Sequence, residues 1–419
     1  MIGSKWLKSP PWRVTWFLFF AAALNYADRA ALSSVIIPLR AELGITDTQV
    51  GVMSMLFLWC YALASPFAGM WADRYSRSRI VLASLVAWSA VMFFTGFVQT
   101  AFALMAFRVA LGVAESFYLP AAAALIGDHH GPETRGRAMG LHMTGLKVGI
   151  MVGGTLAGFL AEHFGWRAGF WILGGAGLGM ALGSRFFLVD AVMPPRPLAA
   201  GKPRGEVRAA LTYIARVPSF YAMIVCTMTV GVANWIFFTW LPVYFGETHG
   251  MRLAAAGLFG AALFKVPNLV GIMAGGWLSD WYARRDARNR TYLKALSFLL
   301  SGPILFLFLW APTLGAVAVV LGLSTLIRSL GAPNEHPIVC DIIPSQYRST
   351  AIGLLNACAT AAGGAGVLLS GIFKADLGLN VIFAASSFFY VLAGAVTLYS
   401  YLFNVKNDIA KAREAEAAG

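Results

Sequence analysis

Long apolar stretches alternate with short polar segments along the whole chain. A stretch of ~20 apolar residues is long enough to cross a bilayer as a helix, and we identify twelve of about that length: 14–38, 48–72, 80–98, 101–127, 137–161, 168–190, 218–245, 254–279, 292–311, 313–340, 349–373 and 378–403. The first has no small-residue cleavage site and is followed by many more, so we interpret it as a membrane helix, not a signal peptide. The pattern predicts an all-α membrane protein with 12 transmembrane helices.

The longest polar stretch falls between the sixth and seventh apolar stretches. Prolines and basic residues in MPPRPLAAGKPRGEVRAALTYIARVP predict a cytoplasmic linker at 191–217 that includes at most a short surface helix. The linker separates an N-terminal six-helix bundle at 1–190 from a C-terminal six-helix bundle at 218–405, which a cytoplasmic tail follows at 406–419.

Composition supports this class. Only 12% of the residues are charged and 58% are hydrophobic, whereas a soluble domain has about twice that charge. The net charge of +13 comes from basic residues in alternate loops, as the positive-inside rule requires of cytoplasmic segments. Both termini are therefore predicted to be cytoplasmic, in a multi-pass protein of the inner (plasma) membrane. The charge reflects topology and contact with anionic lipids, not nucleic-acid binding.

Four cysteines lie in or near the predicted spans without CxxC spacing. We expect packing roles for them, and no metal or other cofactor.

Polar residues recur at matching places in the two halves, which indicates a duplication. Asp128, Arg135 and Gly140 have the spacing of Asp341, Arg348 and Gly353. A second match lies after the second and eighth spans, where Gly69, Asp73 and Arg77 correspond to Gly276, Asp280 and Arg284. A repeat of six helices predicts a binding cavity between the halves, near the membrane midplane.

The loop after the second span carries the more specific signal. GMWADRYSRSR resembles the G-x-x-x-D-R-x-G-R-R loop of the major facilitator superfamily, with Ser76 where glycine is usual. The resemblance implies two six-helix bundles and a conformational latch on the cytoplasmic face, formed by Gly69, Asp73, Arg74, Arg77, Asp280 and Arg284. The alternative is that these charges serve only the positive-inside topology.

Nine ionisable residues within the predicted spans stand out. Each costs ~3 kcal/mol near a helix centre, so they must face a watery cavity or one another: Asp28, Arg29, Arg108, Glu115, Lys147, Lys265, Arg328, Glu335 and His336. Asn25, Asp28 and Arg29 share one helix face, and we expect Asp28 to hold Arg29 when the site is empty.

Two interpretations of these charges stay open. The carboxylates either exchange protons or form static ion pairs with arginines. Lys147 and Lys265, one from each half, either bind an anionic substrate or pair with Glu115 and Glu335. Arg328, Glu335 and His336 could also form a cluster of their own.

Longer sequence segments bear on the roles of these charges. NYADRA and RVALGVAESFYLP resemble helices one and four of the anion:cation symporter branch, which includes sugar-acid transporters. NWIFFTWLPVYF resembles its helix seven. The resemblance implies that Asp28 and Glu115 couple protons. With the intramembrane cations, it gives the expected substrate-binding set: Tyr26, Arg29, Tyr61, Arg108, Lys147, Asn234, Trp235, Lys265, Arg328, Glu335 and Asn356.

The chain departs from that branch at Lys147, where the sugar-acid members carry glutamine, and the added cation implies a more anionic substrate or a different one altogether. GVAESFY and DRYSR also resemble the spinster-like lysolipid and sphingolipid transporters, which are the alternative family.

Other classes of function fit less well. No GxSxG, HExxH or P-loop pattern supports an enzyme, and a repeat with a latch in each half favours alternating access over a channel. The sequence therefore predicts a monomeric secondary active transporter that couples protons to the symport of a small organic anion, such as a sugar acid or other carboxylate. Its expected partners are that anion, protons and membrane lipids. A lysolipid transporter or a proton-coupled exporter is the alternative.

Overall fold

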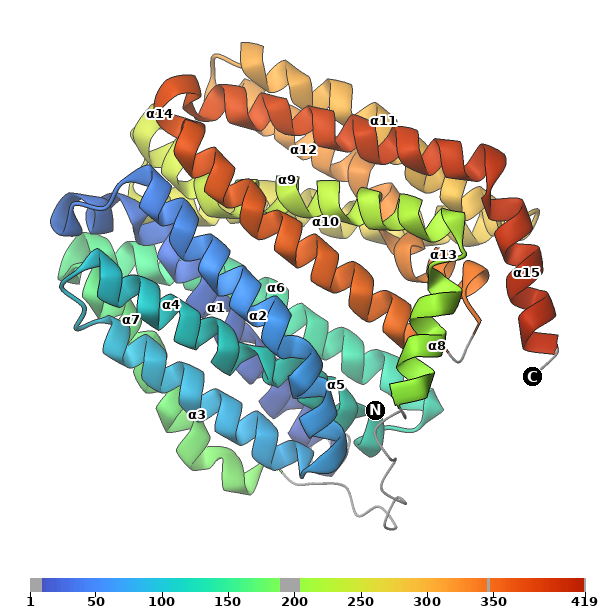
Figure 1. The fold of residues 1–419 in the computed structure, drawn as a ribbon. Helices are drawn as coiled ribbons and strands as arrows, with labels where there is room; N and C mark the ends of the chain where they lie inside the picture. The colour runs from blue at the N-terminus through green and yellow to red at the C-terminus, as the bar shows by residue number, and fades with distance from the viewer. Residues whose placement is uncertain (1–9, 189–203, 345–346, 418–419) are drawn as a thin grey trace, which may run out of the picture. The chain divides into compact units, whose positions relative to one another are not determined.

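The computed structural model describes residues 10–188, 204–344 and 347–417, which contain helices and no strand (Figure 1). The first half consists of α1 (Pro10–Leu43), α2 (Asp47–Arg74), α3 (Arg77–Thr95), α4 (Ala101–Ser116), α5 (Tyr118–His129), α6 (Pro132–Phe164) and α7 (Trp166–Gly183). These helices coincide with the first six predicted spans, except that the fourth span is divided at Phe117 into α4 and α5.

The second half begins with α8 (Arg204–Ile214), the short helix expected in the linker; residues 189–203 lie outside the described ranges. It continues with α9 (Pro218–His249), α10 (Leu253–Ala283), α11 (Asn289–Phe306), α12 (Leu314–Gly331), α13 (Glu335–Ile342), α14 (Arg348–Phe403) and α15 (Val405–Ala417). The C-terminal tail is thus largely the helix α15, whose Asp408 accepts a hydrogen bond from the backbone N–H of Ser219, at the start of α9.

α14 contains the last two predicted spans. A left-handed glycine, Gly378 (φ 73°), interrupts the helical backbone between them. In the first half, Gly165 (φ 84°) lies between α6 and α7. A residue with a Cβ is strained at such φ values, so the same backbone requirement explains a glycine at both junctions.

Side-chain contacts repeat between the halves as well. Arg135 donates from Nε to the carbonyl of His130 and from Nη2 to that of Gly127, at 3.2 and 3.0 Å. Arg348 donates in the same way to the carbonyls of Ile343 and Cys340, at 3.0 and 2.7 Å. Each arginine thereby binds carbonyls that a helix leaves without partners at its C-terminus.

An ion pair beside each of these turns is repeated too. Arg77, at the start of α3, pairs with Asp128 at the end of α5. Arg290, at the start of α11, pairs with Asp341 at the end of α13, with 3.2 Å between nitrogen and oxygen. Thr100 and Thr313 cap α4 and α12 at equivalent positions. The duplication inferred from the sequence therefore extends to individual contacts.

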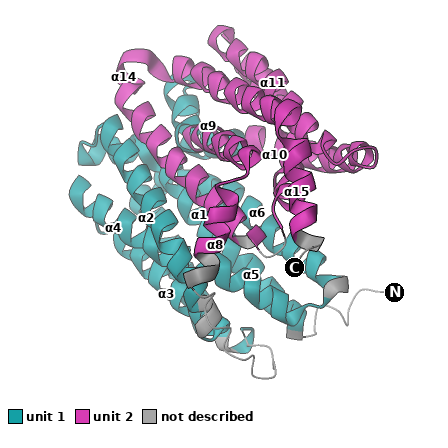
Figure 2. Ribbon diagram, turned by 45° about the vertical axis from the view of Figure 1, so that its right-hand side comes forward, with its two compact units in different colours: residues 1–201, 238–261 teal, residues 202–237, 262–419 magenta. Residues whose placement is uncertain are grey.

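The helices form two compact units (Figure 2). Unit 1 comprises residues 1–201 and 238–261, and unit 2 comprises residues 202–237 and 262–419. The predicted bundles at 1–190 and 218–405 differ from this division, because residues 238–261, at the end of α9 and the start of α10, belong to unit 1. Within unit 1, Arg40 of α1 pairs with Glu247 of α9 at 2.7 Å.

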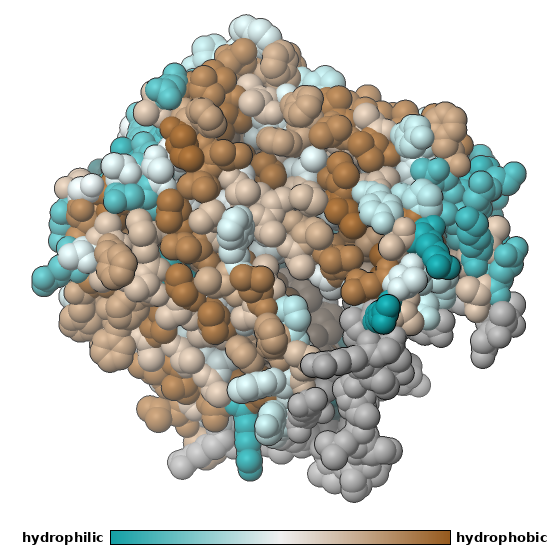
Figure 3. All heavy atoms as spheres, in the orientation of Figure 1, coloured by the Kyte–Doolittle hydropathy of each residue, from teal (hydrophilic) through white to brown (hydrophobic). Residues whose placement is uncertain are grey.

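The surface is strongly apolar (Figure 3). Exposed large side chains include Leu63 (71% exposed), Phe102 (81%) and Trp277 (73%). Nine helical stretches in the described residues are long and apolar enough to cross a membrane, and one of them, Thr350–Phe403, contains the two helices that meet at Gly378. These properties are those expected of helices whose outer faces contact lipid.

Candidate functional site

A buried ion pair joins α1 to α4 in unit 1. Arg29 Nε lies 2.6 Å from Glu115 Oε2, and the side chains are only 5% and 0% exposed. The Arg29 Nη2 group also lies 3.5 Å from the Asn25 side-chain oxygen, one turn earlier on α1. The i, i+4 spacing of Asn25 and Arg29 directs both side chains toward Glu115.

Aromatic rings surround the Arg29 guanidinium. Its central carbon lies 4.6, 5.1 and 4.7 Å from the ring centroids of Tyr26, Phe57 and Tyr61. Phe57 also lies beside Arg108 of α4, at 4.5 Å. Cations over ring faces gain electrostatic stabilisation, and more so away from water. α1, α2 and α4 therefore surround two cations with aromatic rings, and this cluster brings together Tyr26, Tyr61 and Arg108 of the predicted binding set.

Several polar atoms of this cluster have no hydrogen-bond partner in the described part of the chain. They are both carboxyl oxygens of Asp28, Oε1 of Glu115, Nδ2 of Asn25, and Nε and Nη1 of Arg108. Asp28 is fully buried. An isolated buried charge is costly, so the cluster favours anything that neutralises Asp28 or binds Arg108.

The expectation that Asp28 holds Arg29 was wrong. Glu115 makes the ion pair instead, because Asp28 precedes Arg29 by one residue and so projects from α1 about 100° away. Of the two arrangements left open for the carboxylates, Glu115 therefore adopts the ion pair, whereas Asp28 has no ion pair among the described residues.

Unit 2 contains a second set of cations. Arg328 of α12 is 5% exposed, and its guanidinium carbon lies 5.2 Å from the Phe264 ring centroid and 5.4 Å from that of Tyr390. Lys265 Nζ lies 5.5 Å from the same Phe264 ring. Phe264 thus contacts two of the cations that the sequence singled out in this half.

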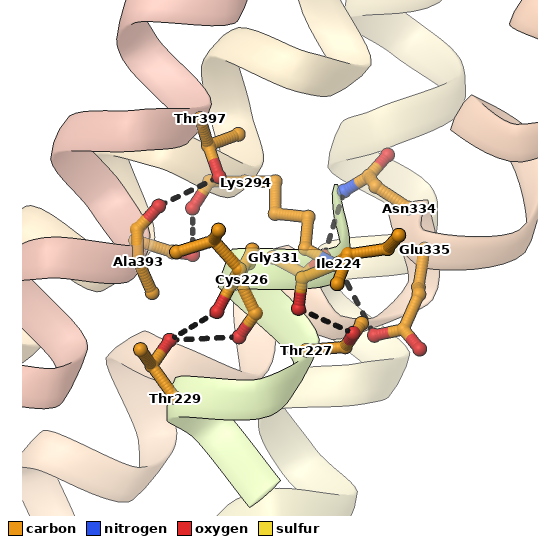
Figure 4. Close-up of polar contacts among 12 residues, drawn as sticks. Ile224, Cys226, Thr227, Thr229, Lys294, Gly331, Asn334, Glu335, Ala393 and Thr397 are labelled. Atoms are coloured by element: carbon orange, nitrogen blue, oxygen red, sulfur yellow. Dashed lines mark hydrogen bonds and ion pairs between the residues drawn. The ribbon is translucent and has the colours of Figure 1, made fainter. Parts of the chain in front are cut away.

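One alternative grouped Arg328, Glu335 and His336 in a cluster of their own. Glu335 of α13 binds Lys294 of α11 instead, at 3.1 Å (Figure 4). Lys294 is missing from the ionisable residues that we placed inside the predicted spans, and this omission was an error, since Lys294 is only 1% exposed. The signal that could have revealed it is its position two residues inside the predicted span 292–311.

The other predicted binding residues are more scattered. Lys147 is exposed, on the face of α6 away from the glycines that pack against α1, and Glu115, one candidate partner for it, is bound by Arg29. Asn234 has a buried side-chain oxygen without a hydrogen-bond partner, Trp235 packs beside Gly363, and Asn356 is exposed.

The predicted latch is described only in part. Arg77 pairs with Asp128 and donates to the Ala124 carbonyl at 3.2 Å. Gly69 is partly exposed, and Asp280 and Arg284 are exposed. The side chains of Asp73 and Arg74 lie outside the described residues.

The sequence profile of the Major Facilitator Superfamily matches residues 18–325, well over half of the chain. The chain belongs to this superfamily. It is therefore a multi-pass membrane transporter and not an enzyme.

Among members of the superfamily, the chain is similar to a probable sulfoacetate transporter of Cupriavidus necator, with 27% identity over 80% of each chain. It is 25% identical to the hexuronate transporter of Bacillus subtilis, over 92% of each chain. Its fold resembles that of a bacterial homologue of the human lysosomal transporter Spinster, solved in an inward-facing, unoccupied conformation. That comparison gives a TM-score of 0.82 and 20% identity, and covers 95% of this chain and 98% of the other.

Proposed function

We propose that this transporter carries a small organic anion together with protons, and that Arg29, Glu115 and Asp28 form the coupled site. The observation that carries the proposal is the buried Arg29–Glu115 pair, with the unpartnered Asp28 carboxyl next to Arg29 on α1. Such a site contains a cation for the substrate and two carboxyl groups for protons.

The anion-binding role belongs to Arg29. A guanidinium presents a fork of donors that matches a carboxylate or sulfonate, and Glu115 occupies its Nε. Sulfoacetate, hexuronate and L-galactonate, named for three relatives, are organic anions. This supports an anionic substrate, and Arg108, whose Nη1 lacks a partner, can add a second contact.

The proton role follows from charge balance. In the empty site, Glu115 neutralises Arg29. A proton on Glu115 removes that anion, and Arg29 then binds the substrate in its place. One proton and one monovalent anion add no net charge to the buried site, so each favours the other. Linkage of this kind is typically worth ~1–3 kcal/mol.

Asp28 gives a second proton position. Its carboxyl is buried beside Arg29, and an ionised form there would need a partner that the described residues do not supply. A proton on Asp28 also keeps the negative charge near an incoming anion low. The substrate class that fits best is a small carboxylate or sulfonate of sugar-acid size.

Binding measurements on Arg29 variants test the substrate class. A thermal-shift screen against sulfoacetate, hexuronates, other carboxylates and neutral lysolipids identifies a ligand, because binding to the folded state raises the melting temperature. Calorimetry should then show that Arg29→Gln loses ~2–5 kcal/mol of binding. Arg29→Lys should recover only part, since an ammonium lacks the fork.

The exposed Arg216 supplies the control, and Arg216→Gln should bind normally. Anion binding that Arg29→Gln leaves unchanged on folded protein would reject the proposed site. Equal binding of neutral lysolipids and small anions would favour the spinster-like alternative.

A further inference from the structure

A groove lies on unit 1, and neither Arg29 nor Glu115 lines it. Its cavity of about 780 Å³ is bounded by α2, α3, α4 and Phe117. The small side chains Ala83 and Ala87 of α3 and Ala110 and Ala114 of α4 line it, so the hollow exists because these two helices present alanines to each other there. Cavities of this size accommodate ligands comparable to drug-sized molecules.

The groove is amphipathic. Val91, the alanines and Phe117 make its apolar wall, whereas Ser76 and Arg79 lie at the α2–α3 end. Arg79 is exposed, and no hydrogen-bond or ionic partner of its guanidinium is found among the described residues. The opening therefore pairs one available cation with a long apolar interior.

Aromatic residues mark the same end. Trp71 is 54% exposed and Tyr75 is 64% exposed, and their rings stack edge to face at 5.9 Å. Trp71 also contacts Phe117 at 5.6 Å. Tryptophan and tyrosine concentrate at the level of lipid headgroups, which places this end at a membrane interface. The surrounding face of α2, α3 and α4 is largely apolar (Figure 3).

We propose that the groove binds one anionic phospholipid. An acyl chain fills the space between the alanines of α3 and α4, and the phosphate binds Arg79. The complementarity of charge and shape selects this occupant, because the described lining offers apolar depth and one cation, Arg79, at an interface. A small anion would leave the apolar wall uncovered, and an uncharged hydrocarbon would not use Arg79.

The groove also borders the segment that carries Glu115. Phe117 divides α4 from α5 and lies two residues after Glu115. A lipid seated against Phe117 therefore contacts the backbone break next to the Arg29–Glu115 pair. We expect the occupant to change the rate of transport, while the groove itself binds lipid whether or not transport is coupled to protons.

Brominated lipids test the proposal, since bromine quenches tryptophan fluorescence at short range. The full-length protein is reconstituted with phosphatidylglycerol or phosphatidylcholine carrying brominated acyl chains. The signal of interest is the quenching that disappears in Trp71→Phe. In the wild-type protein, this Trp71-dependent quenching should saturate at a lower fraction of brominated phosphatidylglycerol than of brominated phosphatidylcholine. Arg79→Gln should reduce that preference by about fivefold, the contribution of one basic residue near an anionic surface.

Ala110→Phe should abolish the Trp71-dependent quenching because it fills the groove. Ala106→Phe is the matched control, one turn earlier on the exposed surface of α4 and outside the cavity lining, and should leave the quenching unchanged. If Ala110→Phe does not fold, Ala87→Leu blocks the groove from α3. Equal quenching by the two lipids, or quenching that survives both groove-filling variants, would mean ordinary contact with bulk lipid and would overturn the proposal.

Discussion

Lys294 and Glu335 form a buried pair whose two ends differ in exposure. The Lys294 side chain is 1% exposed and the Glu335 side chain is 33% exposed. A Cβ on Gly331 would overlap the Ser297 hydroxyl and lie 3.0 Å from the Lys294 Cα, so this glycine lets α11 and the end of α12 approach closely (Figure 4 shows Lys294 and Gly331). Water can therefore solvate a lone Glu335 but not a lone Lys294.

This asymmetry predicts unequal effects of removing either partner. Glu335→Gln should destabilise the protein by ~3–5 kcal/mol, because it strands a buried charge. Lys294→Met should cost less, and the double variant should be more stable than Glu335→Gln alone. Melting temperatures of the three variants in detergent give the order of their stabilities. Asp286→Asn, which breaks the exposed Asp286–Arg288 pair, should cost under about 1 kcal/mol. Equal losses in the two single variants would contradict this description.

Individual residues show what the sequence could and could not predict. The unusual cost of charges inside apolar spans was enough to select Asp28, Arg29, Arg108 and Glu115, which the fold brings together in unit 1. The partner of each charge was not predictable, since pairing depends on how α1 rotates against α4. A rotation of about 100° separates the Asp28 direction from the Arg29 direction, so Arg29 was assigned to the wrong carboxylate.

At the scale of helices, α1 and α6 pack with their backbones in close contact. Gly145, Gly149 and Gly153 of α6 face Phe19, Ala23 and Ala27 of α1, and a Cβ on Gly149 would overlap the Ala23 carbonyl. Small residues at such intervals allow helices to approach closely in membranes. This contact keeps α1, and with it Arg29, in position.

Alanine at Gly149 should therefore push α1 and α6 apart and lower stability by ~1–3 kcal/mol, the usual cost of overpacking. Gly140 lies on the same helix with open space around it. Gly140→Ala should be neutral or stabilising by up to ~1 kcal/mol, because it only raises helix propensity. Thermal unfolding monitored by size-exclusion chromatography compares the stabilities of the two variants. A Gly149→Ala protein as stable as Gly140→Ala would refute the close packing.

The Arg77–Asp128 pair and its copy, Arg290–Asp341, join helix ends in each half. We predict that Arg77→Gln slows turnover and leaves ligand affinity within a few-fold, since Arg77 lies outside the Arg29 cluster. Transport assays and calorimetry on the same preparation check this, with Arg216→Gln as control. An Arg77→Gln protein that is normally expressed but binds no ligand would show that Arg77 has another role.

Helix boundaries were predictable where apolar length decides them, as for α2 and α9. The breaks were harder. Phe117 interrupts the predicted span 101–127, and Pro120 in the first turn of α5 accounts for the break, because proline has no N–H to donate to the Ser116 carbonyl and its ring crowds that carbonyl. Packing of Phe117 against Trp71 accompanies this break, and such a tertiary contact leaves no periodic signal in the sequence.

For the whole molecule, the duplication was the most informative property of the sequence. The repeated spacing of Asp128 and Arg135 in Asp341 and Arg348 predicted two related halves, and the same arginine–carbonyl contacts occur in both. The repeat does not extend to the buried ion pairs. Unit 1 contains the Arg29–Glu115 pair, whereas the buried pair of unit 2, Lys294–Glu335, joins different helices at different positions.

The account as a whole depends on protons binding at Asp28 and Glu115, and uptake into proteoliposomes tests this most directly. With a ligand from the thermal-shift screen, wild-type protein should accumulate it when a proton gradient is imposed. Asp28→Asn and Glu115→Gln should lose this gradient-driven accumulation and keep counterflow exchange, because Arg29, which binds the substrate, is unchanged in both variants. Full gradient-driven uptake in both variants would contradict the account.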